Sequence, residues 1–112
     1  MKQKVKKDDF DICIENRIQQ TKNLILVKGK EYVRNDDRFN NFNRAAEMNR
    51  TTPTRALHGM LSKHLVSIMD MLDDIDKDIM PNISTVEEKL GDAIVYLHIQ
   101  EALIKQTIKN SQ

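Results

Sequence analysis

The sequence has few residues that break helices, with only three glycines and two prolines in 112 residues. It has no tryptophan and one cysteine, Cys13, which cannot form a disulfide within the chain. A lone thiol is typical of proteins in a reducing cytoplasm. The sequence contains no apolar run of the ~18 residues that a membrane span needs, and no glycine-rich phosphate loop. We therefore expect a cytoplasmic, largely helical protein with no membrane association.

The charges of the chain nearly cancel, with 18 Lys and Arg against 17 Asp and Glu. Because long nucleic acids are bound chiefly through an excess of positive charge, we expect no such partner. The hydrophobic fraction of 39% suits one modest core. The composition predicts a single all-α domain over residues 8–112, preceded by a disordered basic arm over residues 1–7.

Four helices are predicted from apolar spacing and from helix-start signals. Thr52-Pro53 offers an N-cap and a proline at the first helical position. Ser84-Thr85-Val86-Glu87 reads as a capping box, in which Ser84 and Glu87 satisfy free backbone N–H groups. The predicted helices span about residues 8–27, 37–48 and 52–78, and the fourth begins at the capping box.

The last two helices carry apolar stripes at alternating spacings of three and four residues. We expect them to pair as a long antiparallel hairpin, on which a helical bundle is built. The fourth helix has a second stripe on another side, which the helix covering Leu90 and Leu97 cannot also cover. We interpret this stripe as the contact with a second subunit, so the protein is predicted to be oligomeric. Its members are Val95, Ile99, Ala102 and Leu103.

Two carboxylates mark the start of the fourth helix. Glu88 and Asp92 are four residues apart, so they share one helix face. As hard oxygen ligands they suit a Mg²⁺ ion bound to a phosphate chain. The alternative is a solvated acidic turn favoured by the helix dipole. On the third helix, Lys63 and His64 could join them in a ligand pocket, with His64 otherwise a hydrogen-bonded core histidine.

The segment before the second helix mixes basic and aromatic residues. Arginine binds phosphates through paired hydrogen bonds, and aromatic rings stack on bases, so the segment suits a nucleotide pocket. The alternative is that the phenylalanines are core residues and the arginines are solvated. The candidate ligand-binding residues here are Lys30, Tyr32, Arg34, Arg38, Phe39 and Phe42.

Several of these patterns together resemble a known group of proteins. The pattern resembles small phage proteins of Gram-positive hosts, and its parts are Lys28-Gly29-Lys30-Glu31-Tyr32, Asp37-Arg38-Phe39, Asn41-Phe42, Lys63-His64 and Glu88-Lys89-Leu90-Gly91-Asp92 with Tyr96-Leu97. These phage proteins are similar to the MazG-like all-α nucleotide pyrophosphohydrolases. The resemblance covers roughly residues 20–104 and implies a helical fold with a nucleotide pocket that includes Lys89, Asp92 and Tyr96. If the protein is phage-encoded, it is expected in the host cytoplasm.

The metal motif departs from that family. MazG-like enzymes hold Mg²⁺ with a Glu-x-x-Glu pair on one helix and a Glu-x-x-Asp pair on the next. Asp92 matches the last acid, but Lys89 stands three residues before it, Glu88 is one residue out of register, and the third helix has no Glu-x-x-Glu. The resemblance thus implies the fold and the pocket, without the complete metal cluster.

Three hypotheses follow. The first is a homo-oligomer that sequesters a nucleotide or cyclic nucleotide signal in an anti-defence role, without metal or turnover and with Lys63 and Lys89 holding the phosphates. The second is a Mg²⁺-dependent nucleoside triphosphate pyrophosphohydrolase with Glu88 and Asp92 as metal ligands. The third is a structural helical module whose polar rows are solvated.

Overall fold

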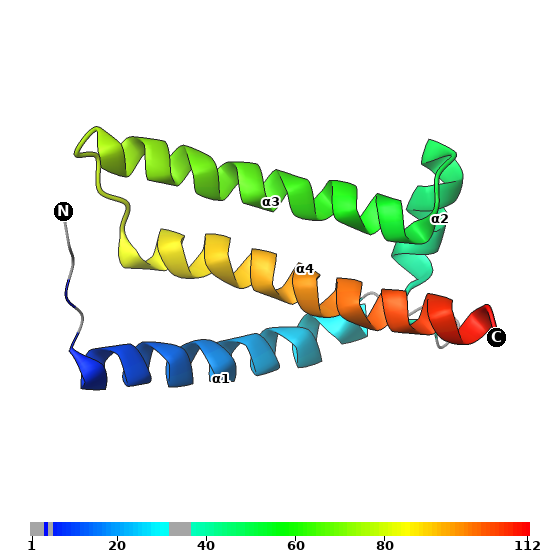
Figure 1. Ribbon diagram of the computed structural model, residues 1–112, viewed down its shortest axis with the longest axis horizontal. Coiled ribbons are helices and arrows are strands. Elements are labelled where there is room, and N and C mark those ends of the chain that lie inside the picture. Colours follow the sequence, from blue (N-terminus) through cyan, green and yellow to red (C-terminus); the bar gives the residue numbers. More distant parts are fainter. Residues whose placement is uncertain (1–3, 5, 32–36) are drawn as a thin grey trace.

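The part of the chain that the structure describes forms four helices, as the sequence predicts for an all-α chain (Figure 1). The computed structural model describes residue 4, residues 6–31 and residues 37–112. The predicted basic arm falls largely outside these residues, and Lys7 is already helical. None of the described helices is long and apolar enough to span a membrane. The helices are α1 (Lys7–Glu31), α2 (Asn40–Asn49), α3 (Pro53–Asp76) and α4 (Ile83–Asn110).

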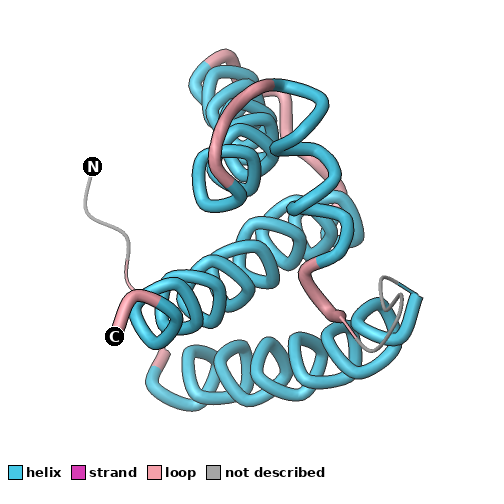
Figure 2. The backbone as a smooth tube through the Cα atoms, turned by 90° about the vertical axis from the view of Figure 1, so that its right-hand side faces the viewer, coloured by secondary structure: helices cyan, strands magenta, loops and turns pink. Residues whose placement is uncertain are grey.

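The two C-terminal helices form the predicted antiparallel hairpin, and α4 is its central member. Figures 1 and 2 show α3 on one side of α4 and α1 on the other, with α1 and α4 running in the same direction. The short α2 packs against α3 at the open end of the hairpin. The result is an elongated bundle-like arrangement, 48 × 28 × 26 Å in extent.

The predicted start of α3 is confirmed. The Thr52 hydroxyl accepts a hydrogen bond from the Arg55 N–H at 3.3 Å, and Pro53 is the first helical residue. The helix ends at Asp76, two residues earlier than predicted. The chain then turns through Asp78, whose φ of 62° lies in the left-handed region, which Asp tolerates better than most residues. This turn reverses the chain and allows the hairpin to form.

The predicted N-cap of α4 is wrong by two residues. Asn82, not Ser84, caps the helix, since the Asn82 side-chain oxygen accepts the Thr85 N–H at 2.8 Å. The Ser84 hydroxyl lies within the first turn and donates to the same Asn82 oxygen at 2.7 Å. Asn is as good an N-cap as Ser, and Asn82 meets the free N–H groups first because the chain enters the helix just after Pro81.

The core lies where α2 crosses the open end of the hairpin. Phe42 from α2, Leu57 from α3 and Leu103 from α4 are buried together. Leu57 is completely buried, and so, nearly, is Leu61 one turn along α3. This part of the core is built from all three helices, so it fixes the angle at which α2 meets the hairpin. Half-buried residues that pack against the cluster are Phe39, Met60, Tyr96 and Ile99.

The assignment of the second α4 stripe to another subunit is wrong for two of its four members. Val95 and Leu103 are buried within the chain at 6% and 5% exposure, and Leu103 packs against α2 and α3. The second partner of α4 is α1, which the sequence did not assign to this helix. Leu97 and Ile104, from the other stripe, are instead 50% and 43% exposed. The large apolar side chains that stay exposed on α4 therefore belong to the stripe of Leu90 and Leu97, and not to the stripe that was predicted to contact a second subunit.

Candidate functional site

A lysine connects the two helices of the hairpin. The Lys89 ammonium donates to the Ser67 backbone carbonyl at 3.3 Å and also to the Ser67 hydroxyl. Both side chains are half-buried. Because the ammonium has three donors and no acceptor, two of its three hydrogen bonds are committed to α3. Lys89 therefore has a structural role between α3 and α4.

Next to this lysine, the hairpin brings together three more of the predicted residues. The His64 Nδ1 lies 4.0 Å from the Asp92 Oδ2, with side chains 29% and 28% exposed. The rings of His64 and Tyr96 pack with centroids 4.7 Å apart and planes inclined by 34°. We call His64, Ser67, Lys89, Asp92 and Tyr96 the seam cluster. Each of its members contacts a residue on the other helix of the hairpin.

Asp92 also belongs to a hollow on the α1 side of α4. This α1–α4 hollow has a volume of ≈ 560 Å³, which falls within the range of small-molecule pockets. Its polar and apolar lining comes from both helices. The lining residues are Arg17, Gln20, Asn23, Leu24 and Val27 of α1, and Ser84, Glu87, Glu88 and Asp92 of α4.

Arg17 is the cation among the described residues that line this hollow, and no sequence pattern predicted its place there. Its Nη2 donates to the Glu87 backbone carbonyl at 2.9 Å. The guanidinium lies directly over Gly91, where a Cβ would come within 2.6 Å of Arg17 Nη1. Gly91 is buried in the middle of α4. A glycine inside a helix costs stability and often has a packing reason, but Gly59 within α3 meets nothing within 4 Å, so the glycine pattern alone did not single out this site.

The two predicted carboxylates, Glu88 and Asp92, do line the same hollow. In the described part of the chain, no group of three or more His, Cys, Asp or Glu side chains is placed to hold a metal ion. Mg²⁺ is nevertheless often bound by one or two carboxylates together with substrate phosphates and water. These residues thus suit a shared metal–phosphate site and do not form an all-protein cage.

The described residues 37–42 of the basic and aromatic segment lie at the other end of the hairpin. Arg38 is exposed and, with Phe39, lines a second hollow of ≈ 560 Å³ beside Gln106. Along α4, Gln106 is roughly 21 Å from Asp92 at ~1.5 Å per residue. The structure therefore splits the predicted pocket into two separate places. Phe42 is only 4% exposed in the core, which leaves almost no ring surface on which a base could stack.

The remaining predicted ligand residues contribute less. Lys30 and Lys63 are both exposed, on α1 and α3, and neither lines either hollow. Tyr32 and Arg34 lie outside the described residues. Of the predicted set, the structure gathers His64, Lys89, Asp92 and Tyr96 in the seam cluster, and Glu88 joins Asp92 in the α1–α4 hollow.

Comparison of the chain with protein-family models, curated proteins and solved structures found no match.

Proposed function

We propose that the protein binds a nucleotide or cyclic nucleotide in the α1–α4 hollow and holds it without turnover. One observation supports this most strongly: a guanidinium, two amides and apolar side chains line the same nucleotide-sized space. Arg17 offers a planar cation that matches a phosphate, and Gln20 and Asn23 offer the donors and acceptors of a base edge. Leu24 and Val27 offer apolar surface for the face of a base.

The position of Arg17 suits the binding of an anion. The guanidinium has five N–H donors, and one hydrogen bond to the Glu87 carbonyl holds it in place. In the described part of the chain this is its only hydrogen bond, so its remaining donors are available to a phosphate. Since this hydrogen bond and the contact with Gly91 orient the group before ligand arrives, little of its side-chain freedom is lost on binding. The lysines proposed from the sequence lack this orientation toward the hollow.

The carboxylates set the condition for binding. A phosphate near Glu87, Glu88 and Asp92 meets like charge, which opposes its binding. Arg17 offsets part of this repulsion, and we infer that the bound group places its phosphate at the Arg17 end. The charge of the hollow also favours a ligand with few negative charges, such as a cyclic nucleotide, over a triphosphate.

The alternative is a Mg²⁺-dependent nucleoside triphosphate pyrophosphohydrolase of the MazG-like type. The observation that favours it is the presence of both Glu88 and Asp92 in one hollow with a cation. These two carboxylates would hold the ion together with phosphate oxygens. A bound Mg²⁺ would supply Lewis-acid polarisation of a phosphoryl oxygen. In that case Arg17 would bind the phosphate chain beside the metal.

The biological role proposed for the first reading follows from the resemblance to phage proteins. A protein that holds a nucleotide signal and releases it slowly lowers the free concentration of that signal in the host cytoplasm. Such sequestration would blunt a nucleotide-based defence of the host. We further propose that the protein acts as a homo-oligomer, because many large apolar side chains of this small chain are exposed.

The decisive experiment is incubation with a panel of nucleotides, including cyclic dinucleotides and triphosphates, with and without Mg²⁺. The protein is then separated and heat-denatured, and the released compounds are identified by mass spectrometry. Intact ligand retained without Mg²⁺ supports holding, whereas Mg²⁺-dependent release of pyrophosphate supports the enzyme. If nothing is retained or cleaved, both readings fail and a structural module remains.

Two variants test whether nucleotide binding takes place in the α1–α4 hollow. Arg17→Gln removes the cation while keeping a polar side chain of similar reach, and binding should weaken roughly tenfold or more because a charge-assisted contact is lost. Arg44→Gln is the matched control, since Arg44 is an exposed arginine on α2, outside the hollow. Equal affinities of the two variants would exclude the α1–α4 hollow as the binding site.

A further inference from the structure

One side of α3 carries an apolar stripe that is open to solvent. Leu65, Met69 and Leu72 are 42%, 60% and 51% exposed. Their spacings of four and three residues place them on one side of the helix. Contiguous apolar surface of this kind is uncommon on monomeric proteins and marks a site of contact.

Two exposed apolar residues of α4, Leu97 and Ile104, lie on the same side of the hairpin. The His58 Nδ1 and the Gln100 Nε2 are hydrogen-bonded across the two helices at 3.1 Å. His58 is seven residues before Leu65, and Gln100 lies between Leu97 and Ile104 at spacings of three and four. The two exposed stripes therefore flank this hydrogen bond and form one surface. This hairpin face comprises Leu65, Met69, Leu72, Leu97 and Ile104.

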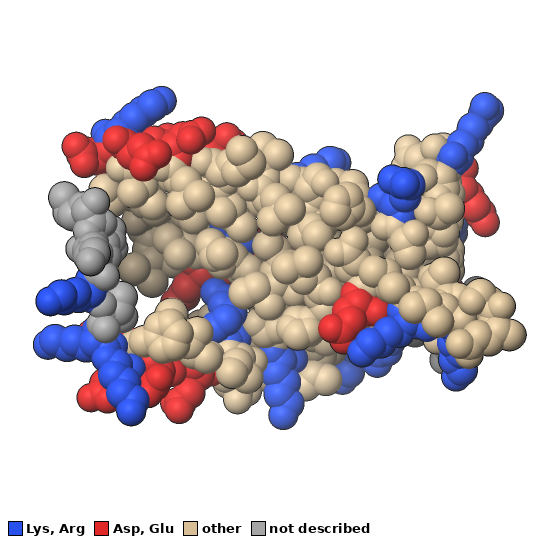
Figure 3. All heavy atoms as spheres, in the orientation of Figure 1, with Lys and Arg blue, Asp and Glu red and all other residues tan. Residues whose placement is uncertain are grey.

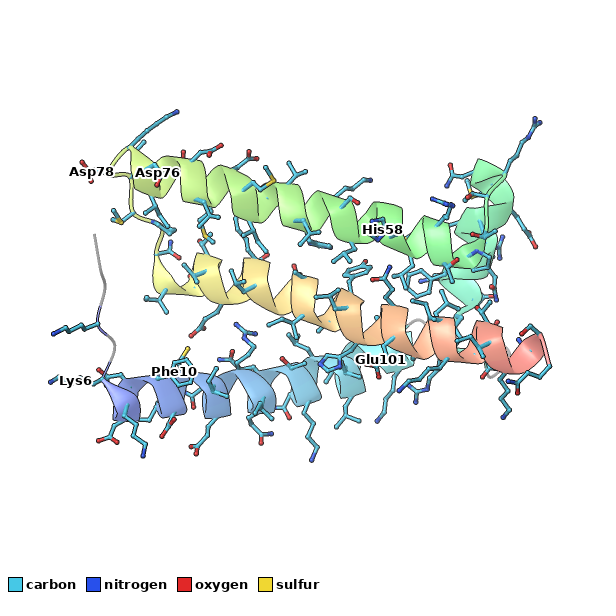
Figure 4. The ribbon with its side chains drawn as sticks, in the orientation of Figure 1. Lys6, Phe10, His58, Asp76, Asp78 and Glu101 are labelled. Atoms are coloured by element: carbon cyan, nitrogen blue, oxygen red, sulfur yellow. The ribbon has the colours of Figure 1, made fainter. Side chains whose placement is uncertain are left out.

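Charged residues are also unevenly distributed along the hairpin, with acidic side chains gathered at one end and basic side chains at the other. The two basic residues of α3, Arg55 and Lys63, lie in its N-terminal half, and its four aspartates lie in its C-terminal half. Figure 3 shows these acidic side chains grouped at the end of α3 beside the turn, and Figure 4 labels Asp76 and Asp78 there. The other end is richer in Lys and Arg, including Lys105 and Lys109 of α4. The middle of the visible surface over α3 and α4 carries little charge (Figure 3).

We propose that a second copy of the chain packs on the hairpin face, related by a two-fold axis that crosses the helices near Leu65 and Met69. This axis makes the α3 helices of the two copies antiparallel neighbours. It brings Arg55 and His58 of one copy beside Asp73 and Asp76 of the other. A two-fold axis along the helices would instead place one acidic end on the other, so charge selects the crossing axis.

The size of the face suits this partner. From Arg55 to Asp76 the stripe is about 32 Å long at ~1.5 Å per residue, and two helices about 10 Å across give a width of roughly 20 Å. The product, a projected area of roughly 600 Å², is smaller than the accessible surface of the face because side chains protrude from it. It approaches the ~800 Å² that each partner buries in a stable dimer. The inference specifies the interface of the proposed homo-oligomer and does not depend on any nucleotide.

Light scattering on the whole chain at micromolar concentration tests the partner. The wild-type protein should have the mass of a dimer, and Met69→Glu should weaken the dimer roughly tenfold or more by placing a charge in the apolar stripe. Met48→Glu is the matched control, because Met48 is 84% exposed on α2, away from the face. A monomeric wild-type protein, or equal weakening by both variants, would overturn the inference.

Disulfide trapping in a Cys13→Ser background tests the axis. Leu65→Cys should cross-link two copies under mild oxidation, because a residue beside a two-fold axis meets its own copy. Arg55→Cys should cross-link only when Asp76→Cys is also present. Cross-linking of Arg55→Cys alone would overturn the antiparallel arrangement. Arg17→Gln should leave the dimer mass unchanged, so loss of nucleotide binding and loss of the dimer are separate results.

Discussion

The contact between Arg17 and Gly91 makes a sharp prediction about Gly91→Ala. Alanine is favoured over glycine inside a helix by about 0.5–1 kcal/mol, so the change should stabilise α4. The new Cβ would, however, lie 2.6 Å from Arg17 Nη1. The guanidinium must then move and lose its hydrogen bond to the Glu87 carbonyl, which is worth about 0.5–1.5 kcal/mol. We therefore expect almost no net change in the free energy of unfolding.

The same contact predicts how two substitutions combine. In an Arg17→Ala background nothing opposes the methyl group, and Gly91→Ala should stabilise by the full amount, about 0.5–1 kcal/mol. The two substitutions should therefore be coupled by about 0.5–1.5 kcal/mol. The control is Gly59→Ala on α3, where an added Cβ meets nothing within 4 Å, and it should stabilise equally in both backgrounds.

Urea denaturation followed by circular dichroism measures these free energies. Equal effects of Gly91→Ala in both backgrounds would refute the packing of Arg17 on Gly91. A loss of several kcal/mol in both would mean that backbone, and not a flexible side chain, occupies the space. Under the proposed function, Gly91→Ala should also weaken nucleotide binding, because it displaces the cation without removing it.

Three further predictions concern stability and titration. Asn82→Ala should lower the free energy of unfolding by about 1 kcal/mol through loss of the N-cap, and Ser84→Ala by much less; equal losses in urea melts would argue for a shared cap. Thr21 is 7% exposed, and in the described part of the chain its hydroxyl finds no hydrogen-bond partner. Thr21→Val should therefore stabilise by about 1 kcal/mol, and a lower melting temperature would contradict this. The hydrogen bond from Lys105, together with its charge, holds the pKa of Glu101 below its ordinary value. Lys105→Met should raise that pKa, as an NMR titration of the carboxyl carbon can show. Because the pKa is lowered, the stabilisation by this pair is present at neutral pH and is lost as the pH falls through the titration of Glu101.

The helices and the hairpin could be predicted because they depend on local and periodic information. The spacing of apolar residues defined α3 and α4, and Thr52-Pro53 defined where α3 begins. Pro81 separated the two long helices, which then pair as close neighbours in the chain. Where two good capping residues stood close together, as at Asn82 and Ser84, composition did not distinguish them, and only the path of the chain into the helix did.

The candidate site was predictable only in part. Glu88 and Asp92 were placed on one face by helical geometry, and the hairpin brought His64 to Asp92. Arg17 lies 70 residues before Glu87, the residue that it contacts. No local pattern indicates which side of α4 is covered by α1, the helix that carries Arg17.

What the sequence alone determined is therefore a set of helices, their ends to within a few residues, and the faces of each helix that are apolar or charged. Tertiary structure decided which face met which helix. It assigned α1 to the Gly91 side of α4, buried Val95 and Leu103 within the chain, and left Leu97 and Ile104 exposed. The physical reason is that each of two apolar stripes on a helix gains the same kind of burial energy against any apolar partner. The choice depends on the packing of the whole chain, because burial energy is proportional to area and carries no direction.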